Sequence, residues 1–371
     1  MIREDLKNIP FYVPGKQGPN LLRLASNETS AQPLESVSKA ISEAALGINR
    51  YPDMGATELR ERIAEWFART NADSPATGAP TTTLTRNNVA VGNGSTAMCL
   101  QSIQATCNDG DEVLFAWRSF EAYPILAKIA GATPVQVPLT ADHRHDFDAM
   151  LSAITPRTRL IFVCNPNNPT GTVMTHREVE EFIERVPDHI HVVVDEAYQD
   201  YDRTPEKVNA AALVARFPHV ALCRTFSKAY GLAGVRLGFM IGAPDFIEAI
   251  NKVGIPFGVN ALAQVAGLAS VTEEAGRELS SRVDATIEQR DRVSNSLPSE
   301  LRTPSHTNFL WLPLGDKAAA FNQALLDAGV VARAFPGDGV RVTVTDHTET
   351  EQLIPALRQA LEAVGLEPAQ E

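Results

Sequence analysis

Short apolar runs alternate with amphipathic stretches between about residue 85 and residue 242. Several runs are apolar almost throughout, which is typical of parallel strands that are buried on both faces. Helical stretches lie between most of them, and one begins at Thr175, which forms a capping box with Glu178. The pattern predicts an α/β fold with a mostly parallel seven-stranded sheet between helices. The seven predicted strands are NVAVGNG, EVLFAW, TPVQVPL, RLIFVCNP, HVVVDEAY, VALCRTFS and RLGFMIGA.

The pattern changes after about residue 256. A charged, periodic and proline-free stretch predicts a long helix over residues 272–297. HTNFLWLPL, VVARAF and GVRVTV then predict three strands, with helices near 317–328 and 348–364, as in a smaller α+β domain. The first thirty residues are too short for a domain. We expect an N-terminal segment (1–30) packed on the small domain, a large domain (31–255), and a linking helix with a small C-terminal domain (256–371).

Composition narrows the class of protein. A chain of 371 residues with 44% hydrophobic content can bury a large core. Its net charge of -12 and the absence of a basic stripe argue against a nucleic-acid partner. No run of about 18 apolar residues predicts a membrane span, and no signal peptide is evident, so we expect a cytoplasmic protein. The four cysteines show no metal-ligand spacing and are interpreted as reduced core residues.

Polar clusters follow four of the predicted strands. They are Gly92–Thr96, Asn165–Gly171, Asp195–Tyr198 and Thr225–Lys228. Each alone has an ordinary explanation: a tight turn, a turn-rich loop, a helix cap or a surface lysine. Ligands of open α/β sheets bind beyond the carboxyl ends of strands, however, and the helix that follows Gly94 could hold a phosphate. Together the clusters fit one ligand that carries a phosphate, a ring nitrogen and an aldehyde, which is pyridoxal 5'-phosphate.

Specific motifs strengthen this interpretation. YVPG, SNET, RYPD, GNGS, NPNNPTG, VVDEAY, TFSKAYGLAGVRLG and GVRVTV follow one another along essentially the whole chain. In this order they resemble fold-type I pyridoxal-phosphate aminotransferases, and among these the histidinol-phosphate aminotransferase family. The resemblance implies an aspartate aminotransferase-like fold, a homodimer, and transamination between an amino acid and a 2-oxo acid in amino-acid biosynthesis.

The resemblance also implies roles for individual residues. Lys228 would bind the cofactor covalently and then move a proton at the substrate α-carbon. Asp195 would keep the pyridine nitrogen protonated. The other implied cofactor contacts are Tyr198 and Asn168 at the ring hydroxyl, Phe120 on the ring face, Thr225, Ser227, Arg236 and the backbone N–H groups of Ser95 and Thr96 at the phosphate, and Tyr51 at the phosphate of the neighbouring subunit.

Further positions are implied to surround the substrate. Arg341 matches the arginine that pairs with the α-carboxylate, which a guanidinium binds in bidentate fashion. Asn168, Tyr12, Asn27, Asn260 and Arg333 also fall at substrate positions of the family. Arg333 could equally be a solvated charge beside a strand.

The choice of amino donor depends on departures from the family pattern. The family commonly carries an acidic pair where this chain has Thr96 and Ala97, and often a tyrosine at Phe120. IPFGVNALAQ and GSTA resemble the aromatic (phenylalanine) branch of the family. We therefore expect phenylalanine and tyrosine as donors and 2-oxoglutarate as an acceptor, with histidinol phosphate as the alternative donor.

Two other classes of protein carry similar motifs. Threonine-phosphate decarboxylases keep the cofactor motifs and would release CO₂. Some transcription regulators carry an aminotransferase-like domain behind a DNA-binding domain, for which about thirty residues leave too little room.

Overall fold

The computed structural model describes residues 2, 5–11, 18, 20–71 and 84–368 of the chain. Its central sheet confirms the predicted seven strands, and β8 alone among them runs antiparallel to its neighbours. In sheet order the strands are β2 (Val89–Gly92), β8 (Gly238–Ile241), β7 (Val220–Thr225), β6 (His191–Asp195), β5 (Thr158–Cys164), β3 (Glu112–Trp117) and β4 (Thr133–Pro138).

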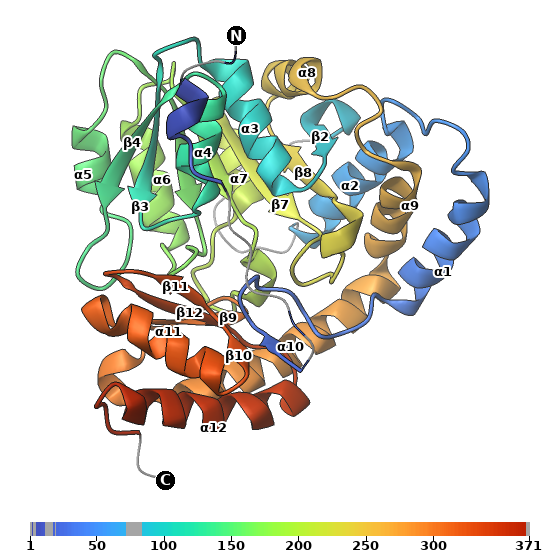
Figure 1. Cartoon of the computed structure of the whole chain (residues 1–371). Helices are drawn as coiled ribbons and strands as arrows, with labels where there is room; N and C mark the ends of the chain where they lie inside the picture. Colours follow the sequence, from blue (N-terminus) through green and yellow to red (C-terminus); the bar gives the residue numbers. More distant parts are fainter. Residues whose placement is uncertain (1, 3–4, 12–17, 19, 72–83, 369–371) are drawn as a thin grey trace.

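Helices cover both faces of this sheet (Figure 1). On β5, Leu160 and Phe162 pack in the core that contains α3, α4 and α8, while Ile161 and Val163 pack in the core of α5, α6 and α7. Because alternate side chains enter two apolar cores, nearly every residue of these strands is apolar. The helices of this large part are α1 (Glu35–Ala44), α2 (Thr57–Thr70), α3 (Ser95–Thr106), α4 (Ala122–Ile129), α5 (Phe147–Ser152), α6 (His176–Arg185), α7 (Ala210–Arg216), α8 (Pro244–Val253) and α9 (Ala261–Ser270).

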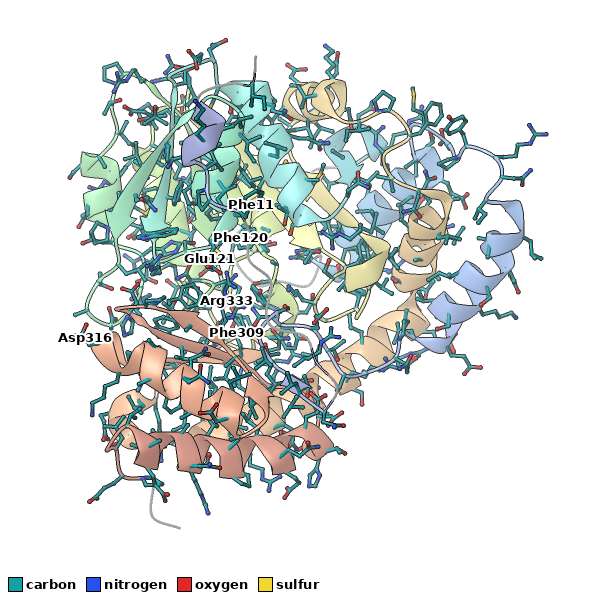
Figure 2. The ribbon with its side chains drawn as sticks, in the orientation of Figure 1. Phe11, Phe120, Glu121, Phe309, Asp316 and Arg333 are labelled. Atoms are coloured by element: carbon teal, nitrogen blue, oxygen red, sulfur yellow. The ribbon has the colours of Figure 1, made fainter. Side chains whose placement is uncertain are left out.

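The C-terminal residues form a smaller region below the central sheet (Figure 1). It consists of an antiparallel sheet in the order β11-β12-β9 and two helices that pack on it. Phe309 and Arg333 of this small sheet lie close to the seam with the large part, below Phe120 and Glu121 (Figure 2). The elements are β9 (Phe309–Leu312), β11 (Arg333–Phe335), β12 (Gly339–Thr343), α11 (Ala318–Asp327) and α12 (His347–Ala363).

One long helix and one short strand pair link the two regions. The helix α10 (Glu273–Asn295) contributes Leu279 and Val283 to the core around α2 and Val293 to the C-terminal core. The strand β1 (Leu22–Arg23) pairs in parallel with β10 (Val330–Val331). The core around α2 also includes residues of α9, so the core of the large part extends beyond the predicted boundary at residue 255. The division at residues 30 and 255 stays a proposal.

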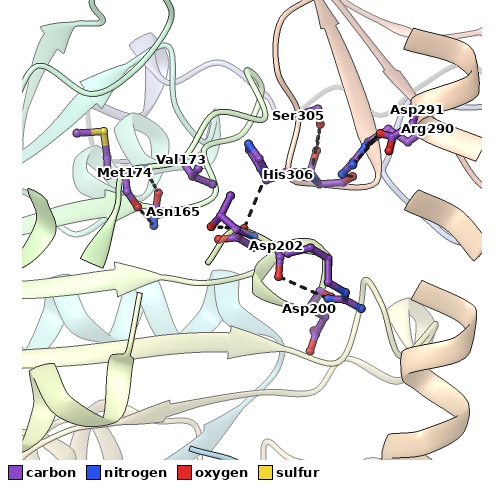
Figure 3. Close-up of polar contacts among 12 residues, drawn as sticks. Asn165, Val173, Met174, Asp200, Asp202, Arg290, Asp291, Ser305 and His306 are labelled. Atoms are coloured by element: carbon purple, nitrogen blue, oxygen red, sulfur yellow. Dashed lines mark hydrogen bonds and ion pairs between the residues drawn. The ribbon is translucent and has the colours of Figure 1, made fainter. Parts of the chain in front are cut away.

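The small region also contacts the loop after β5 directly. The backbone N–H of His306 donates to the carbonyl of Gly171 at 2.8 Å. A Cβ on Gly171, whose φ is +77°, would lie 2.7 Å from Ser305 Oγ, so glycine allows this close approach. His306 Nδ1 lies 3.8 Å from Asp202 Oδ1, across the same junction (Figure 3). These contacts hold the small region against the NPNNPTG loop and against the segment that follows β6. Within the described residues, no helix is long and apolar enough to cross a membrane.

Candidate active site

A cavity of about 520 Å³ lies where β5, β6 and β7 end. Parallel strands place their carboxyl ends at one edge of a sheet, so polar groups that follow these strands meet there. The predicted site residues that line the cavity are Asn27, Ser95, Thr96, Phe120, Asn168, Asp195, Tyr198, Thr225, Ser227, Lys228, Arg236 and Arg341.

Two glycines bring the backbone close together at one end of the cavity. A Cβ on Gly94, whose φ is +86°, would lie 2.6 Å from Arg236 Nη2. A Cβ on Gly238 would lie 2.5 Å from the backbone nitrogen of Ser95, the first residue of α3. Larger residues would therefore separate the arginine, the turn and the start of α3 from one another.

Arg236 itself has a left-handed backbone, with φ 59° and ψ 63°. This conformation is uncommon outside glycine and indicates a position that its surroundings constrain. Its Nη1 donates to the carbonyl of Ala233 at 2.9 Å and to Ser227 Oγ at 3.3 Å. The guanidinium thus stays beside the first turn of α3, where N–H groups lack helical acceptors. The donor set is suited to a phosphate.

Asp195 ends β6 and is buried at the cavity wall. The hydroxyl of Tyr123 donates to its Oδ2 at 2.6 Å, and the backbone N–H of Ala197 donates to its Oδ1 at 3.3 Å. Burial raises the pKa of this carboxyl, and the two hydrogen bonds oppose the rise. A cationic N–H group in the cavity would stabilise the ionised carboxylate.

Lys228 follows β7 and reaches into the same cavity. Its Nζ donates to the carbonyl of Ser26 at 2.8 Å and lies 5.9 Å from the centre of the Tyr198 ring. Burial, together with the smaller effect of the nearby charges of Arg341 and Arg236, lowers the pKa of this amine to about 7. A substantial fraction is therefore neutral near pH 7, as a nucleophilic or basic lysine requires.

Tyr198 and Asn27 form a buried polar pair beside the lysine. Asn27 Nδ2 donates to the Tyr198 hydroxyl at 2.8 Å, and Thr343 Oγ1 donates to Asn27 Oδ1 at 3.0 Å. Burial raises the pKa of Tyr198, so its hydroxyl keeps its proton. The amide of Asn27 thus orients a neutral phenol.

Arg341 brings a guanidinium from β12 into the cavity. It is buried, its Nη1 donates to Asn168 Oδ1, and its Nη2 donates to the carbonyl of Ala25. These contacts leave a fork-shaped cation facing the cavity that contains Lys228. A carboxylate is the natural partner of such a group.

Three predicted residues among those described do not line the cavity. Tyr51 is 82% exposed and contacts Phe257, with ring centres 4.7 Å apart. Arg333 forms an ion pair with Glu121 instead of facing solvent. Asn260 caps α9, because its Oδ1 accepts a hydrogen bond from the Ala263 N–H at 2.9 Å. Tyr12 lies outside the described residues.

The sequence analysis missed three residues that shape the site. Tyr123 is fully buried against Asp195, Ser26 accepts the Lys228 hydrogen bond, and Glu121 partners Arg333. Tyr123 lies in the first turn of α4, and its ring contacts that of Phe120, which precedes the helix, with ring centres 5.4 Å apart. In the described part of the chain, no cluster of three or more histidine, cysteine or acidic residues could hold a metal ion.

The fold and the cavity together define an aminotransferase. The chain belongs to the class I and II aminotransferase family, whose model matches residues 19–357. It is 54% identical to an aromatic amino acid aminotransferase of Corynebacterium jeikeium, over 99% of this chain and 95% of the relative. It is 48% identical to an aromatic amino acid aminotransferase of Rhodococcus jostii, over 95% and 94% of the two chains.

Solved structures share the fold. A histidinol-phosphate aminotransferase of Sinorhizobium meliloti, in complex with pyridoxal-5'-phosphate, superposes with a TM-score of 0.82 at 24% identity, covering 98% of each chain. A tetra mutant of Thermus thermophilus aspartate aminotransferase superposes with a TM-score of 0.80 at 25% identity, again covering 98% of each. These matches establish the aspartate aminotransferase-like fold expected from the sequence.

Proposed function

We propose that this protein is a pyridoxal 5'-phosphate-dependent aminotransferase that moves an amino group between an aromatic amino acid, phenylalanine or tyrosine, and a 2-oxo acid such as 2-oxoglutarate. One observation carries the proposal: a lysine amine, a buried carboxylate and an anion-binding cradle line a single cavity. The relatives named aromatic amino acid aminotransferase, at 54% and 48% identity, support the choice of substrate.

The residues present fit the cofactor. The cradle of Arg236 and the first turn of α3 suits its phosphate, and the buried Asp195 suits a protonated ring nitrogen. Phe120 would lie on the ring face, and Tyr198 and Asn168 would contact the ring oxygen. The phosphate contacts would be Thr225, Ser227, Arg236 and the backbone N–H groups of Ser95 and Thr96.

When bound, the cofactor supplies an electron sink for the pair of electrons left on the substrate α-carbon when its proton departs. The Nζ of Lys228 would remove that proton in the amino-acid half-reaction and would deliver a proton to the α-carbon in the 2-oxo-acid half-reaction, since a pKa of about 7 suits a general base near neutral pH. Arg341 would hold the α-carboxylate and so orient the α-carbon toward Lys228.

The wall formed by α4 favours an apolar substrate side chain. Ala122, Ile125 and Leu126 of this helix line the cavity, together with Phe120, which lies just before it. Thr96, in the first turn of α3, also lines the cavity and is uncharged. Burying a phenyl ring against such a wall contributes about 2 kcal/mol, or roughly thirtyfold in affinity.

The active unit would be a homodimer in which Tyr51 reaches the cofactor phosphate of the neighbouring subunit. The side chains of Leu46, Ile48, Tyr51, Met54, Ile255 and Phe257 are all exposed, and the rings of Tyr51 and Phe257 lie 4.7 Å apart, so we propose that the six form one apolar patch. This patch adjoins the cavity, because Asn93 Nδ2 donates to the carbonyl of Gly258 at 2.7 Å and so joins it to the turn before α3. A second copy of the chain would bury the patch and bring its own Tyr51 to that turn.

We place the enzyme in the cytoplasm. The four cysteines carry unpaired thiols, and three of them are buried in the core. Reduced thiols are usual in that compartment.

A substrate panel tests the proposal. We expect kcat/KM for phenylalanine and tyrosine, with 2-oxoglutarate as acceptor, to exceed that for histidinol phosphate at least tenfold, and Lys228→Ala to abolish turnover. A tenfold advantage for histidinol phosphate would replace the aromatic assignment with the alternative donor. Release of CO₂ in place of 2-oxo acid would indicate a decarboxylase, and full activity of Lys228→Ala would overturn the site.

A further inference from the structure

Glu121 and Arg333 form a paired ion contact at the seam between the large part and the small region (Figure 2). Arg333 Nε donates to Glu121 Oε2 at 3.1 Å, and Arg333 Nη2 donates to Oε1 at 2.9 Å. The side chains are 18% and 25% exposed, so neither charge is fully solvated. A two-pronged pair of this kind is stronger than a single surface contact.

The topology places this pair next to Arg341, the residue proposed to hold the α-carboxylate. Arg333 of β11 is the direct antiparallel partner of Arg341 of β12, so both side chains leave the small sheet on the same face. Arg341 enters the cavity and Arg333 binds Glu121. Glu121 stands between Phe120, which lines the cavity, and the apolar wall of α4. Two cations are therefore neighbours in the small sheet, and the carboxylate of Glu121 holds Arg333.

We propose that Glu121 determines substrate specificity by holding Arg333 in an ion pair. The enzyme then prefers substrates with an uncharged side chain over substrates with an anionic side chain. This inference rests on the proposed function. An anionic side chain would have to displace Glu121 from two charge-assisted hydrogen bonds before it could bind Arg333. A phenyl ring that packs on α4 requires no such exchange. An acidic acceptor such as 2-oxoglutarate competes with Glu121 for the same guanidinium and binds more weakly than it would to an unpartnered arginine.

The chain offers a matched control for a purely structural role. Arg118 Nε donates to Asp338 Oδ2, and this pair also joins the large part to the small region. Unlike Arg333, neither residue is the strand partner of Arg341. Asp338→Asn therefore removes a comparable bridge between the two regions without changing the charge beside Arg341.

The test compares Glu121→Gln and Asp338→Asn in the holoenzyme. We measure kcat/KM for the amino-acid half-reaction with glutamate and with phenylalanine. Glu121→Gln is expected to raise the glutamate-to-phenylalanine ratio about tenfold, the value of one strong charge-assisted contact. Asp338→Asn is expected to leave the ratio within twofold of wild type. An unchanged ratio in Glu121→Gln, or an equal shift in Asp338→Asn, would overturn the inference.

Binding of unreactive acids gives a readout that does not depend on turnover. Calorimetry is expected to show about tenfold tighter glutarate binding to Glu121→Gln and unchanged binding of 3-phenylpropanoate. Adding Arg333→Met to Glu121→Gln should remove the gain for glutarate, and a gain that persists would contradict a role through Arg333. If Glu121→Gln folds poorly, Arg333→Met alone must weaken glutarate binding and spare 3-phenylpropanoate, or the inference fails. If wild type converts neither phenylalanine nor tyrosine, the proposed function itself fails, whichever way these ratios move.

Discussion

The side-chain amide of Asn27 donates a 2.8 Å hydrogen bond to the hydroxyl of Tyr198, although 171 positions separate the two residues. Asn27 is buried, and its φ of 55° places it in the left-handed region that asparagine tolerates. The bond joins the N-terminal segment to the end of β6, where the candidate cofactor site lies.

We expect Asn27→Gly to lower kcat/KM about tenfold, because Tyr198 loses the donor that orients its hydroxyl. Glycine accepts the same positive φ, so the variant removes the amide without adding backbone strain. Steady-state kinetics with phenylalanine measure the effect. A variant that keeps wild-type kcat/KM would show that the amide does not orient Tyr198 for function.

Gly238→Ala should weaken cofactor binding at least tenfold. The added methyl group would meet the Ser95 nitrogen at 2.5 Å and push α3 away from Arg236. Gly276→Ala is the matched control, since a Cβ there has nothing within 4 Å. Titration of each apoprotein with pyridoxal phosphate, followed by absorbance, compares the two dissociation constants. Equal constants in the two variants would argue against the phosphate cradle.

Mixing two inactive variants should restore activity if sites are shared across a dimer. Lys228→Ala lacks the amine, and Tyr51→Ala lacks the residue proposed to cross the interface. A heterodimer of the two contains one complete site, so random mixing should recover about a quarter of wild-type activity. Sedimentation of the same samples reports the oligomeric state. A fully active monomer would exclude the shared site.

The stability of the protein should fall in mild acid because of His145. Burial lowers the pKa of this imidazole to about 4, whereas an unfolded histidine titrates near 6.5. Between these values the unfolded state binds more protons, so stability decreases as pH falls from about 6.5 toward 4. The loss at pH 5 relative to pH 7 should be about 2 kcal/mol.

Urea unfolding of wild type and His145→Gln at pH 7 and pH 5 measures this contribution. The variant should lose less stability than wild type between the two values, since glutamine does not titrate. Other buried histidines, such as His191, also have lowered pKa values, but they are present in both proteins and cancel in the comparison. Identical pH dependence in the two proteins would assign the acid sensitivity elsewhere.

Patterns within short stretches of the sequence were enough to predict much of the fold. The apolar runs predicted all seven strands of the central sheet, and Thr175 with Glu178 forms the expected capping box at the start of α6. These predictions succeed because burial on both faces and helix capping act over a few neighbouring residues. The polar clusters after the strands also indicated one common cavity, since parallel strands end at the same edge.

Those patterns could not predict contacts between segments that are distant in the sequence. Glu121 and Arg333 are 212 positions apart, and their pairing follows from the way the small sheet lies against α4. Tyr123 had no role assigned from the sequence, because only the folded chain brings its hydroxyl to Asp195. Periodicity reports which face of an element is buried, whereas the partner that covers a charge or a hydroxyl depends on the packing of whole elements. For this reason the motifs indicated the cofactor chemistry, and the folded chain was needed to reveal the residues that surround and tune it.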